Sequence, residues 1–244
     1  MNQRPALIWD FDGTLAYQEG KWSGAMLAAM NELAPGHGLT LKDVRPLMHS
    51  GFPWDEPEKL HPELTDPQAW WTFLEAYLVR VALALGFTGD QAQRIARRVH
   101  RVQADSRSYH LYPDTLATLD RLKREGYRMI ILSNHVPELP QIVRGLGLTD
   151  AFEAVLGSAQ TAVEKPHPQA FRLAMETLGN PSTAVMIGDN PIADGQGALQ
   201  AGLQPLLVHG CDECASFWHC GQLCEIPALL ASKVQRQGNN NAIE

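Results

Sequence analysis

The hydrophobic and polar positions of this chain divide it into three parts. A short apolar run at residues 4–9 predicts a strand that is buried on both faces. After Thr14 only helical patterns follow for about 90 residues, and from Tyr112 onward short apolar runs alternate again with amphipathic segments. Strands that alternate with helices favour a mainly parallel sheet, and ligands of such sheets bind beyond the carboxyl ends of the strands.

Helix caps and apolar runs predict the individual elements. In the middle part, Ser23 caps a helix at 25–33 and Asp66 caps a helix at 68–85, with further helices at 39–49 and 89–105. In the last part we expect strands at 127–132, 154–156, 183–187 and 205–208, and helices at 114–125, 139–146, 168–178 and 192–201.

These elements predict an α/β fold, a Rossmann-like parallel sheet core with an all-helical cap domain inserted after the first strand. The core comprises residues 1–15 and 111–210, and the cap comprises residues 16–110. A Cys-rich segment, a helix and a polar tail occupy residues 211–244.

Composition narrows the class of partner. The chain has 244 residues, 45% of them apolar, which is ample for a buried core. A net charge of -7 offers no broad basic field, so we expect no nucleic-acid partner. The sequence contains no apolar run long enough to span a membrane and no signal-peptide core, so we expect no membrane association and a cytoplasmic location. We expect a monomer or a homodimer.

All four cysteines lie within a short segment near the C-terminus, at Cys211, Cys214, Cys220 and Cys224. The gap between the first two is that of a zinc knuckle, which suggests a structural Zn²⁺ site. The gap between the other two does not fit the usual second knuckle. Free thiols in an exposed loop and local disulfides are the alternatives, although a cytosolic setting disfavours disulfides.

Acidic side chains follow the first predicted strand. Asp10 and Asp12 are separated by one residue, and Gly13 permits a sharp exit from the strand. Two carboxylates at the end of a buried strand repel each other unless a cation or a shared task offsets the cost. A bound Mg²⁺ ion with a phosphate ligand would offset this repulsion. The alternative is that one of the two acids caps the following turn or helix.

Three further motifs carry polar side chains, two of them at the ends of predicted strands and one before a proline. Ser133 and Asn134 end the second apolar run, Lys165 precedes a proline, and Asp189 and Asp194 follow the strand at 183–187. These four motifs, in this order, resemble those of the haloacid dehalogenase-like hydrolase superfamily from Ala6 to about Val208. Four ordered motifs are far more specific than any one of them.

The resemblance implies a role for each motif residue. Asp10 matches the nucleophile, and Asp12 matches the general acid and base. Mg²⁺ would be held by the carboxylates of Asp10 and Asp189 and by the main-chain carbonyl of Asp12, with Asp194 in support by orienting ligands or holding the lysine. The residues expected to bind the substrate phosphate are Thr14, Ser133, Asn134 and Lys165.

The resulting prediction is a Mg²⁺-dependent phosphomonoester hydrolase that acts on a small phosphorylated metabolite through an aspartyl-phosphate. Asp12 favours phosphate chemistry, because the dehalogenases of the superfamily lack an acid at this place. A phosphomutase or a 2-haloacid dehalogenase of the same superfamily remains an alternative, as does a non-catalytic metal-binding or redox protein that uses the cysteine cluster.

Substrate choice is assigned to the cap, where aromatic and basic residues either contact substrate or serve packing and solvation. The candidates are Lys21, Trp22, Arg45, His49 and Trp54. His135, after the second motif, is equally consistent with an exposed turn residue and with a substrate contact.

Overall fold

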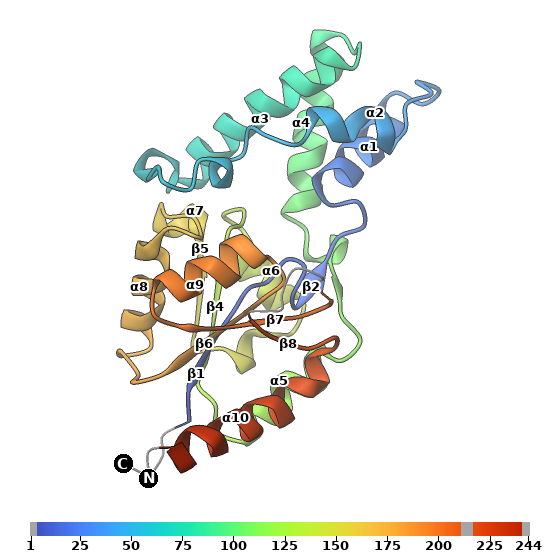
Figure 1. Cartoon of the computed structure of the whole chain (residues 1–244). Helices are drawn as coiled ribbons and strands as arrows, with labels where there is room; N and C mark the ends of the chain where they lie inside the picture. Colours follow the sequence, from blue (N-terminus) through green and yellow to red (C-terminus); the bar gives the residue numbers. More distant parts are fainter. Residues whose placement is uncertain (1–3, 211–216, 241–244) are drawn as a thin grey trace.

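The computed structural model of this chain describes residues 4–210 and 217–240 and contains a six-stranded parallel sheet (Figure 1). Its strand order is β5-β4-β1-β6-β7-β8, so the first strand lies near the centre between two later strands. The strands are β1 (Ala6–Trp9), β4 (Met129–Ser133), β5 (Ala154–Gly157), β6 (Ala184–Gly188), β7 (Gln204–Leu207) and β8 (Trp218–His219). This sheet confirms the predicted Rossmann-like α/β fold class.

The central strand β1 is buried on both faces, as its apolar run predicts. Leu7 and Trp9 belong to one hydrophobic cluster, whereas Ala6 and Ile8 belong to a second. Successive side chains of a strand point to opposite faces, so each cluster covers one face of the sheet. The first face packs against α5 (Thr115–Arg124), α6 (Leu139–Gly145) and α10 (Ile226–Asn240), and the second packs against α8 (Pro168–Thr177) and α9 (Gly197–Gln200).

Between β1 and α5 the chain forms a helical segment, residues 21–108, above the carboxyl ends of the strands (Figure 1). Its α-helices are α1 (Lys21–Leu33), α2 (Leu41–Val44), α3 (Pro67–Ala84) and α4 (Gly89–Gln103). The insertion at 16–110 is not entirely helical, because β2 (Ala16–Tyr17) pairs antiparallel with β3 (His110–Leu111) where the segment joins the sheet. This two-stranded pair corrects the prediction of an all-helical insertion.

Two helix boundaries also differ from the prediction. The first helix begins at Lys21 after Gly20, so Ser23 lies inside the first turn and is not its cap. The helix expected at 39–49 is only the single turn α2, followed by a 3₁₀ turn at Arg45–Leu47. Pro46 explains the break, because a proline cannot donate the backbone hydrogen bond that an α-helix would need there.

The helical segment also contacts the sheet domain at a second place, distant from the β2–β3 pair, namely the loop before α6. The indole of Trp71 on α3 donates to both carboxylate oxygens of Glu138, at 3.0 and 3.1 Å. His100 of α4 stacks on the Trp71 ring, with centroids 3.7 Å apart, and its Nδ1 is hydrogen-bonded to Oε1 of Glu75 at 2.8 Å. These contacts hold α3 and α4 against the loop before α6.

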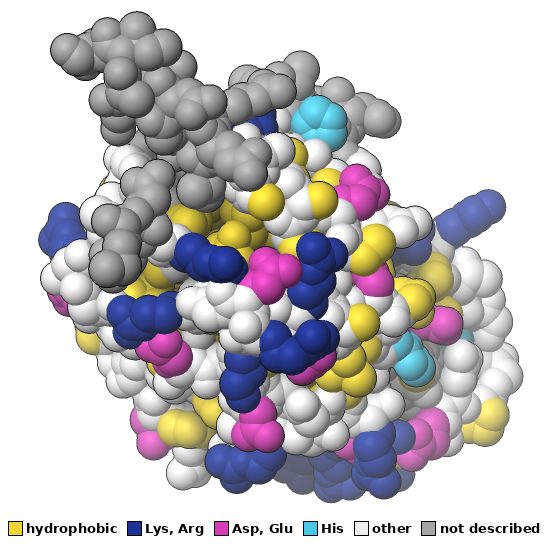
Figure 2. Space-filling view, turned by 90° about the horizontal axis from the view of Figure 1, so that it is seen from below, with side chains coloured by type: hydrophobic (Ala, Val, Ile, Leu, Met, Phe, Trp, Pro, Cys, Tyr) yellow, Lys and Arg dark blue, Asp and Glu magenta, His cyan; other side chains and the backbone are white. Residues whose placement is uncertain are grey.

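The face opposite the helical segment carries mixed charge (Figure 2). Basic and acidic side chains are interspersed there. Exposed ion pairs on the surface of the molecule join Arg128 to Glu153 at 2.6 Å and Arg124 to Asp120 at 2.7 Å. Among the described residues, none of the helices is both long and apolar enough to cross a membrane.

Cys211 and Cys214 lie outside the described residues, so the four-cysteine zinc site stays a prediction. Cys220 is buried beside Leu223 and Ile226 in the apolar cluster, whereas Cys224 is exposed. Burial raises the pKa of the Cys220 thiol to about 12.

Candidate active site

A tight turn after β1 brings Asp10 and Asp12 to the end of the sheet. The amide of Asp10 continues the strand pairing by donating to the carbonyl of Ile187 at 2.8 Å. The Phe11 carbonyl then accepts from the amides of Leu15 and Ala16, which folds the chain back on itself. The turn thus directs both acids away from the strand, toward the cavity described below.

Glycine is required within this turn. Gly13 has a φ of 86°, and a Cβ at this position would lie 2.3 Å from Oδ2 of Asp189. The backbone of the first motif therefore lies directly against the carboxylate of the fourth.

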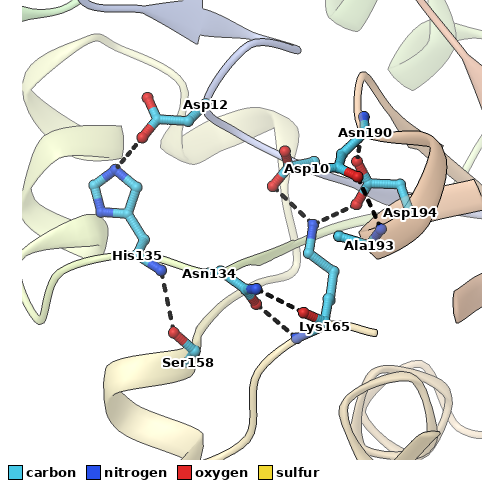
Figure 3. A network of polar contacts seen from close by, with 9 residues as sticks. All are labelled: Asp10, Asp12, Asn134, His135, Ser158, Lys165, Asn190, Ala193 and Asp194. Atoms are coloured by element: carbon cyan, nitrogen blue, oxygen red, sulfur yellow. Dashed lines mark hydrogen bonds and ion pairs between the residues drawn. The ribbon is translucent and has the colours of Figure 1, made fainter. Parts of the chain in front are cut away.

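A buried lysine joins the first and fourth motifs (Figure 3). The Lys165 ammonium lies 2.8 Å from Oδ1 of Asp10 and 2.6 Å from Oδ1 of Asp194, and its side chain is 2% exposed. Burial alone would lower the pKa of Lys165, but the charges of Asp10 and Asp194 outweigh burial and raise it. Lys165 is therefore a permanent cation that holds Asp10 in place.

Asn134 orients this lysine through its backbone. The Asn134 amide nitrogen donates to the carbonyl of Lys165 at 2.8 Å, and its amide oxygen accepts from the Lys165 amide at 2.7 Å. With both polar atoms used in this way, Asn134 supports the loop of Lys165. Asn134 also lines the cavity described below, and its predicted contact with phosphate stays a prediction.

Three carboxylates gather beside β1 and β6. Asp10, Asp189 and Asp194 each offer an oxygen, and the three oxygens lie within 4.8 Å of one another. Burial, and next the negative charge of Asp10, raises the pKa of Asp189 to about 6. Burial raises the pKa of Asp194 to about 7, although Lys165 opposes this shift. So much negative charge in a buried place fits a divalent cation with hard oxygen ligands.

The three acids are not equally available to a cation. Asp194 accepts from Lys165 with one oxygen and from the Asn190 amide, at 3.1 Å, with the other. Asp10 uses only Oδ1 toward Lys165. Among the described residues, carboxylate oxygens without an ion-pair partner therefore remain on Asp10 and Asp189, the two acids whose carboxylates the motifs predict as metal ligands.

The acids line a cavity of about 220 Å³ between the sheet and the helical segment. From the sheet side it is lined by Asp10, Asp12, Ser133 and Lys165, and from the helical segment by Lys21, Trp22, Trp54 and Gln103. Arg45 and His49 instead line a neighbouring hollow, which also reaches Trp22 and Trp54. Three of the five candidate substrate contacts thus face the cavity.

The two hydroxyl residues predicted to bind phosphate differ. Ser133 ends β4 in the cavity wall, and its hydroxyl has no hydrogen-bond partner among the described residues. Thr14 is fully buried and is not among the residues that line the cavity, while its carbonyl accepts from the ring of His209 at 2.9 Å. The Thr14 hydroxyl likewise has no partner among the described residues. Ser133 is thus available to a ligand in the cavity, whereas the contact of Thr14 with phosphate stays a prediction.

Two cavity residues could not be assigned from the sequence. Gln103 closes α4, is 2% exposed, and has an amide nitrogen with no partner in the described part of the chain. His135 is 3% exposed, so the interpretation as an exposed turn residue is wrong. Neither position carries a motif, and only the folded chain brings each to the cavity.

An α/β sheet with an aspartate pair at the end of its central strand and a lysine that bridges to a second acidic strand end is the arrangement expected of a hydrolase of the haloacid dehalogenase type. The family described as "haloacid dehalogenase-like hydrolase" matches residues 5–202. The chain belongs to this family.

Two relatives that this chain resembles are named as phosphatases. The chain is 36% identical over 125 residues to a phosphoserine phosphatase of Thermus thermophilus, and that match covers 50% of this chain and 49% of the relative. It is 29% identical to a phosphoglycolate phosphatase of Rhodobacter capsulatus, with 84% of both chains covered. The match therefore spans about half the length of the first relative and most of the second.

A solved structure shows the same fold with different chemistry. The L-2-haloacid dehalogenase of Xanthobacter autotrophicus superposes with a TM-score of 0.68 at 21% identity, covering 94% of this chain and 99% of that one. At this identity the likeness shows the fold alone. The fold therefore does not separate phosphatase from dehalogenase.

Proposed function

We propose that this protein is a Mg²⁺-dependent phosphatase that hydrolyses a small phosphomonoester through a phosphoryl group carried on Asp10. The observation that carries the proposal is the placement of Asp12: its carboxylate shares the cavity with Asp10, which Lys165 holds in place. The names of the two relatives, phosphoserine phosphatase and phosphoglycolate phosphatase, support it.

In the first step, a carboxylate oxygen of Asp10 attacks phosphorus, and the ester oxygen leaves. Asp12 gives its proton to that oxygen, so the product leaves as a neutral alcohol. In the second step, Asp12 takes a proton from a water molecule, whose oxygen attacks the phosphoryl group and releases Asp10. Phosphate oxygens face the Ser133 hydroxyl and the Lys165 ammonium during both steps.

Asp10 and Asp189 would hold Mg²⁺, with the main-chain carbonyl of Asp12. The ion would neutralise negative charge on the phosphoryl group as that group moves from the ester oxygen to Asp10. The residues fit this ion because the free oxygens on the two acids are hard ligands in a buried, strongly acidic place.

The helical segment is proposed to act as the cap that closes the site and selects the substrate. Its contribution to the cavity wall is one ammonium, from Lys21, and two indoles, from Trp22 and Trp54. A cavity of about 220 Å³ fits a small phosphorylated metabolite.

A panel of phosphorylated metabolites, assayed for phosphate release with Mg²⁺ and with EDTA, tests the function. We expect Mg²⁺-dependent release, and we expect Asp10→Asn to lose at least about a thousandfold of it, since the nucleophile is gone. Asp150→Asn, at an exposed position, is the matched control and should keep full activity. Halide release from 2-haloacids, or full activity of Asp10→Asn, would refute the proposal.

A further inference from the structure

His135 directly follows the second motif, Ser133 and Asn134, and lines the same cavity. Its backbone amide donates to the hydroxyl of Ser158 at 3.1 Å (Figure 3), and its ring packs against two aromatic rings. The Phe11 ring meets it edge-on, with centroids 5.4 Å apart, and the Tyr109 ring lies 5.8 Å away at 36°. The imidazole is therefore fixed by packing and by its own backbone.

The fixed ring faces the proposed general acid. Nε2 of His135 lies 3.3 Å from Oδ2 of Asp12, which is the only side-chain ion pair or hydrogen bond of Asp12 within the described residues. The Asp12 side chain is 39% exposed, whereas that of His135 is 2% exposed. A carboxylate that is otherwise open to the cavity thus has one rigid polar neighbour.

The surrounding groups indicate which nitrogen carries the proton. The Tyr109 hydroxyl donates to the carbonyl of Gln103 at 3.0 Å, so toward His135 Nε2, 3.4 Å away, it offers only an acceptor. Nδ1 is buried and has no partner within the described residues. A proton on Nδ1 would be a buried donor without an acceptor, whereas a proton on Nε2 faces the oxygens of Tyr109 and Asp12.

We propose that His135 is a positioning residue that holds the Asp12 carboxylate through its Nε2 proton, so that the other Asp12 oxygen faces the ester oxygen of the substrate. This inference rests on the proposed phosphatase function and assigns a further residue to it. Contacts of this kind are often long without substrate and tighten when it binds. The energetic reason is preorganisation: an exposed carboxylate that can rotate spends less time aligned with the leaving oxygen.

Leaving groups of different basicity separate this role from a merely structural one. Benzyl phosphate releases a basic alkoxide that needs the proton of Asp12, whereas p-nitrophenyl phosphate releases a phenolate that needs it little. The experiment measures alcohol or phenol release in a single turnover with Mg²⁺, so that hydrolysis of the phosphoenzyme does not limit the rate. We compare wild type, His135→Leu and His135→Gln, where glutamine can place an N–H near the position of Nε2.

We expect His135→Leu to lower the rate about 10- to 100-fold for benzyl phosphate and less than about threefold for p-nitrophenyl phosphate, a fraction of what general acid catalysis supplies. His135→Gln should recover part of the loss. In an Asp12→Asn background, replacing His135 should change neither rate further. His37→Leu, at a histidine of the helical segment whose hydrogen bonds are to Asn31 and Leu39, is the control and should match wild type.

Equal losses for the two esters, or a loss that persists in the Asp12→Asn background, would overturn the positioning role while leaving the phosphatase intact. A wild type that hydrolyses neither ester would refute the proposed function, and this inference with it. If the His135→Leu protein does not fold, His135→Gln decides the question. Its rate must then fall more for benzyl phosphate than for p-nitrophenyl phosphate, by a smaller factor than expected for leucine.

Discussion

Replacing Glu164 with glutamine should make the protein more stable near neutral pH and should change its dependence on pH. Glu164 precedes Lys165, is 2% exposed, and leaves one carboxylate oxygen without a partner among the described residues. Burial raises the pKa of Glu164 to about 7, and a hydrogen bond from Ser158 and the charge of Lys165 offset this only in part. The folded protein therefore keeps Glu164 neutral up to a pH at which the unfolded chain has lost the proton.

The size of the effect follows from that difference. Between the ordinary pKa of 4.5 and about 7, unfolding releases a proton from Glu164, so the free energy of unfolding falls as pH rises. One pKa unit corresponds to about 1.36 kcal/mol, which gives roughly 3 kcal/mol over this window. The contribution is fully present below pH 4.5 and lost above pH 7. Glutamine has no proton to lose, so Glu164→Gln lacks this decline.

Urea unfolding followed by circular dichroism, at pH values from 4.5 to 8 in EDTA, measures the difference. The free energy of unfolding of Glu164→Gln minus that of wild type should rise by about 3 kcal/mol up to pH 7 and then level off. A difference that stays constant within about 1 kcal/mol would refute the reasoning, since Glu164 would then ionise as easily in the folded protein as in the unfolded one.

A glutamate with the opposite shift serves as the control. The ion pair with Arg128 lowers the pKa of Glu153, so the stability it contributes is lost only as pH falls below 4.5. Glu153→Gln should therefore be less stable than wild type by a constant amount across the same window. A slope in that variant would point to a change elsewhere in the protein.

Three further perturbations test the site. Lys165→Met should destabilise the protein by about 3–5 kcal/mol in urea unfolding, because Asp10 and Asp194 lose their buried cation; a variant as stable as wild type would contradict the bridge. Gly13→Ala should cost about 1–2 kcal/mol of stability through its positive φ and should abolish phosphate release by displacing Asp189, so an active variant would contradict the close approach. Mg²⁺ at about 100 times its Kd should stabilise wild type by about 2.7 kcal/mol and should not stabilise Asp189→Asn, as measured by thermal unfolding; equal stabilisation of both would place the ion elsewhere.

The sheet and its motifs were predictable because local physics determines them. Apolar runs as short as 6–9 and 129–133 can be buried on both faces only in the middle of a sheet, and every polar motif residue that follows such a run then lies at the same edge. For this reason the sequence alone predicts that Asp10, Ser133 and Asp189 lie together, and all three line the cavity.

Features that depend on pairing or on competition between elements were not predictable. The two-residue strands β2 and β3 are too short to show a period, and their partners lie more than 90 residues apart. The early end of the second helix reflects one proline, and the start of α1 at Lys21 reflects a turn at Gly20 that no propensity specifies. Local patterns fix the type of element better than its ends.

The sequence by itself determined the fold class and the four motifs with their order along the chain, because periodicity and strand ends are properties of neighbouring residues. Only the tertiary structure decided which side chains at the carboxyl edge of the sheet contact one another and which of them face the cavity. It pairs Lys165 with Asp10 and Asp194, turns Asn134 to the backbone of Lys165, removes Thr14 from the cavity, and buries His135 against Asp12. Each of these depends on distances between residues far apart in the chain, and those distances exist only once the sheet and its loops have packed.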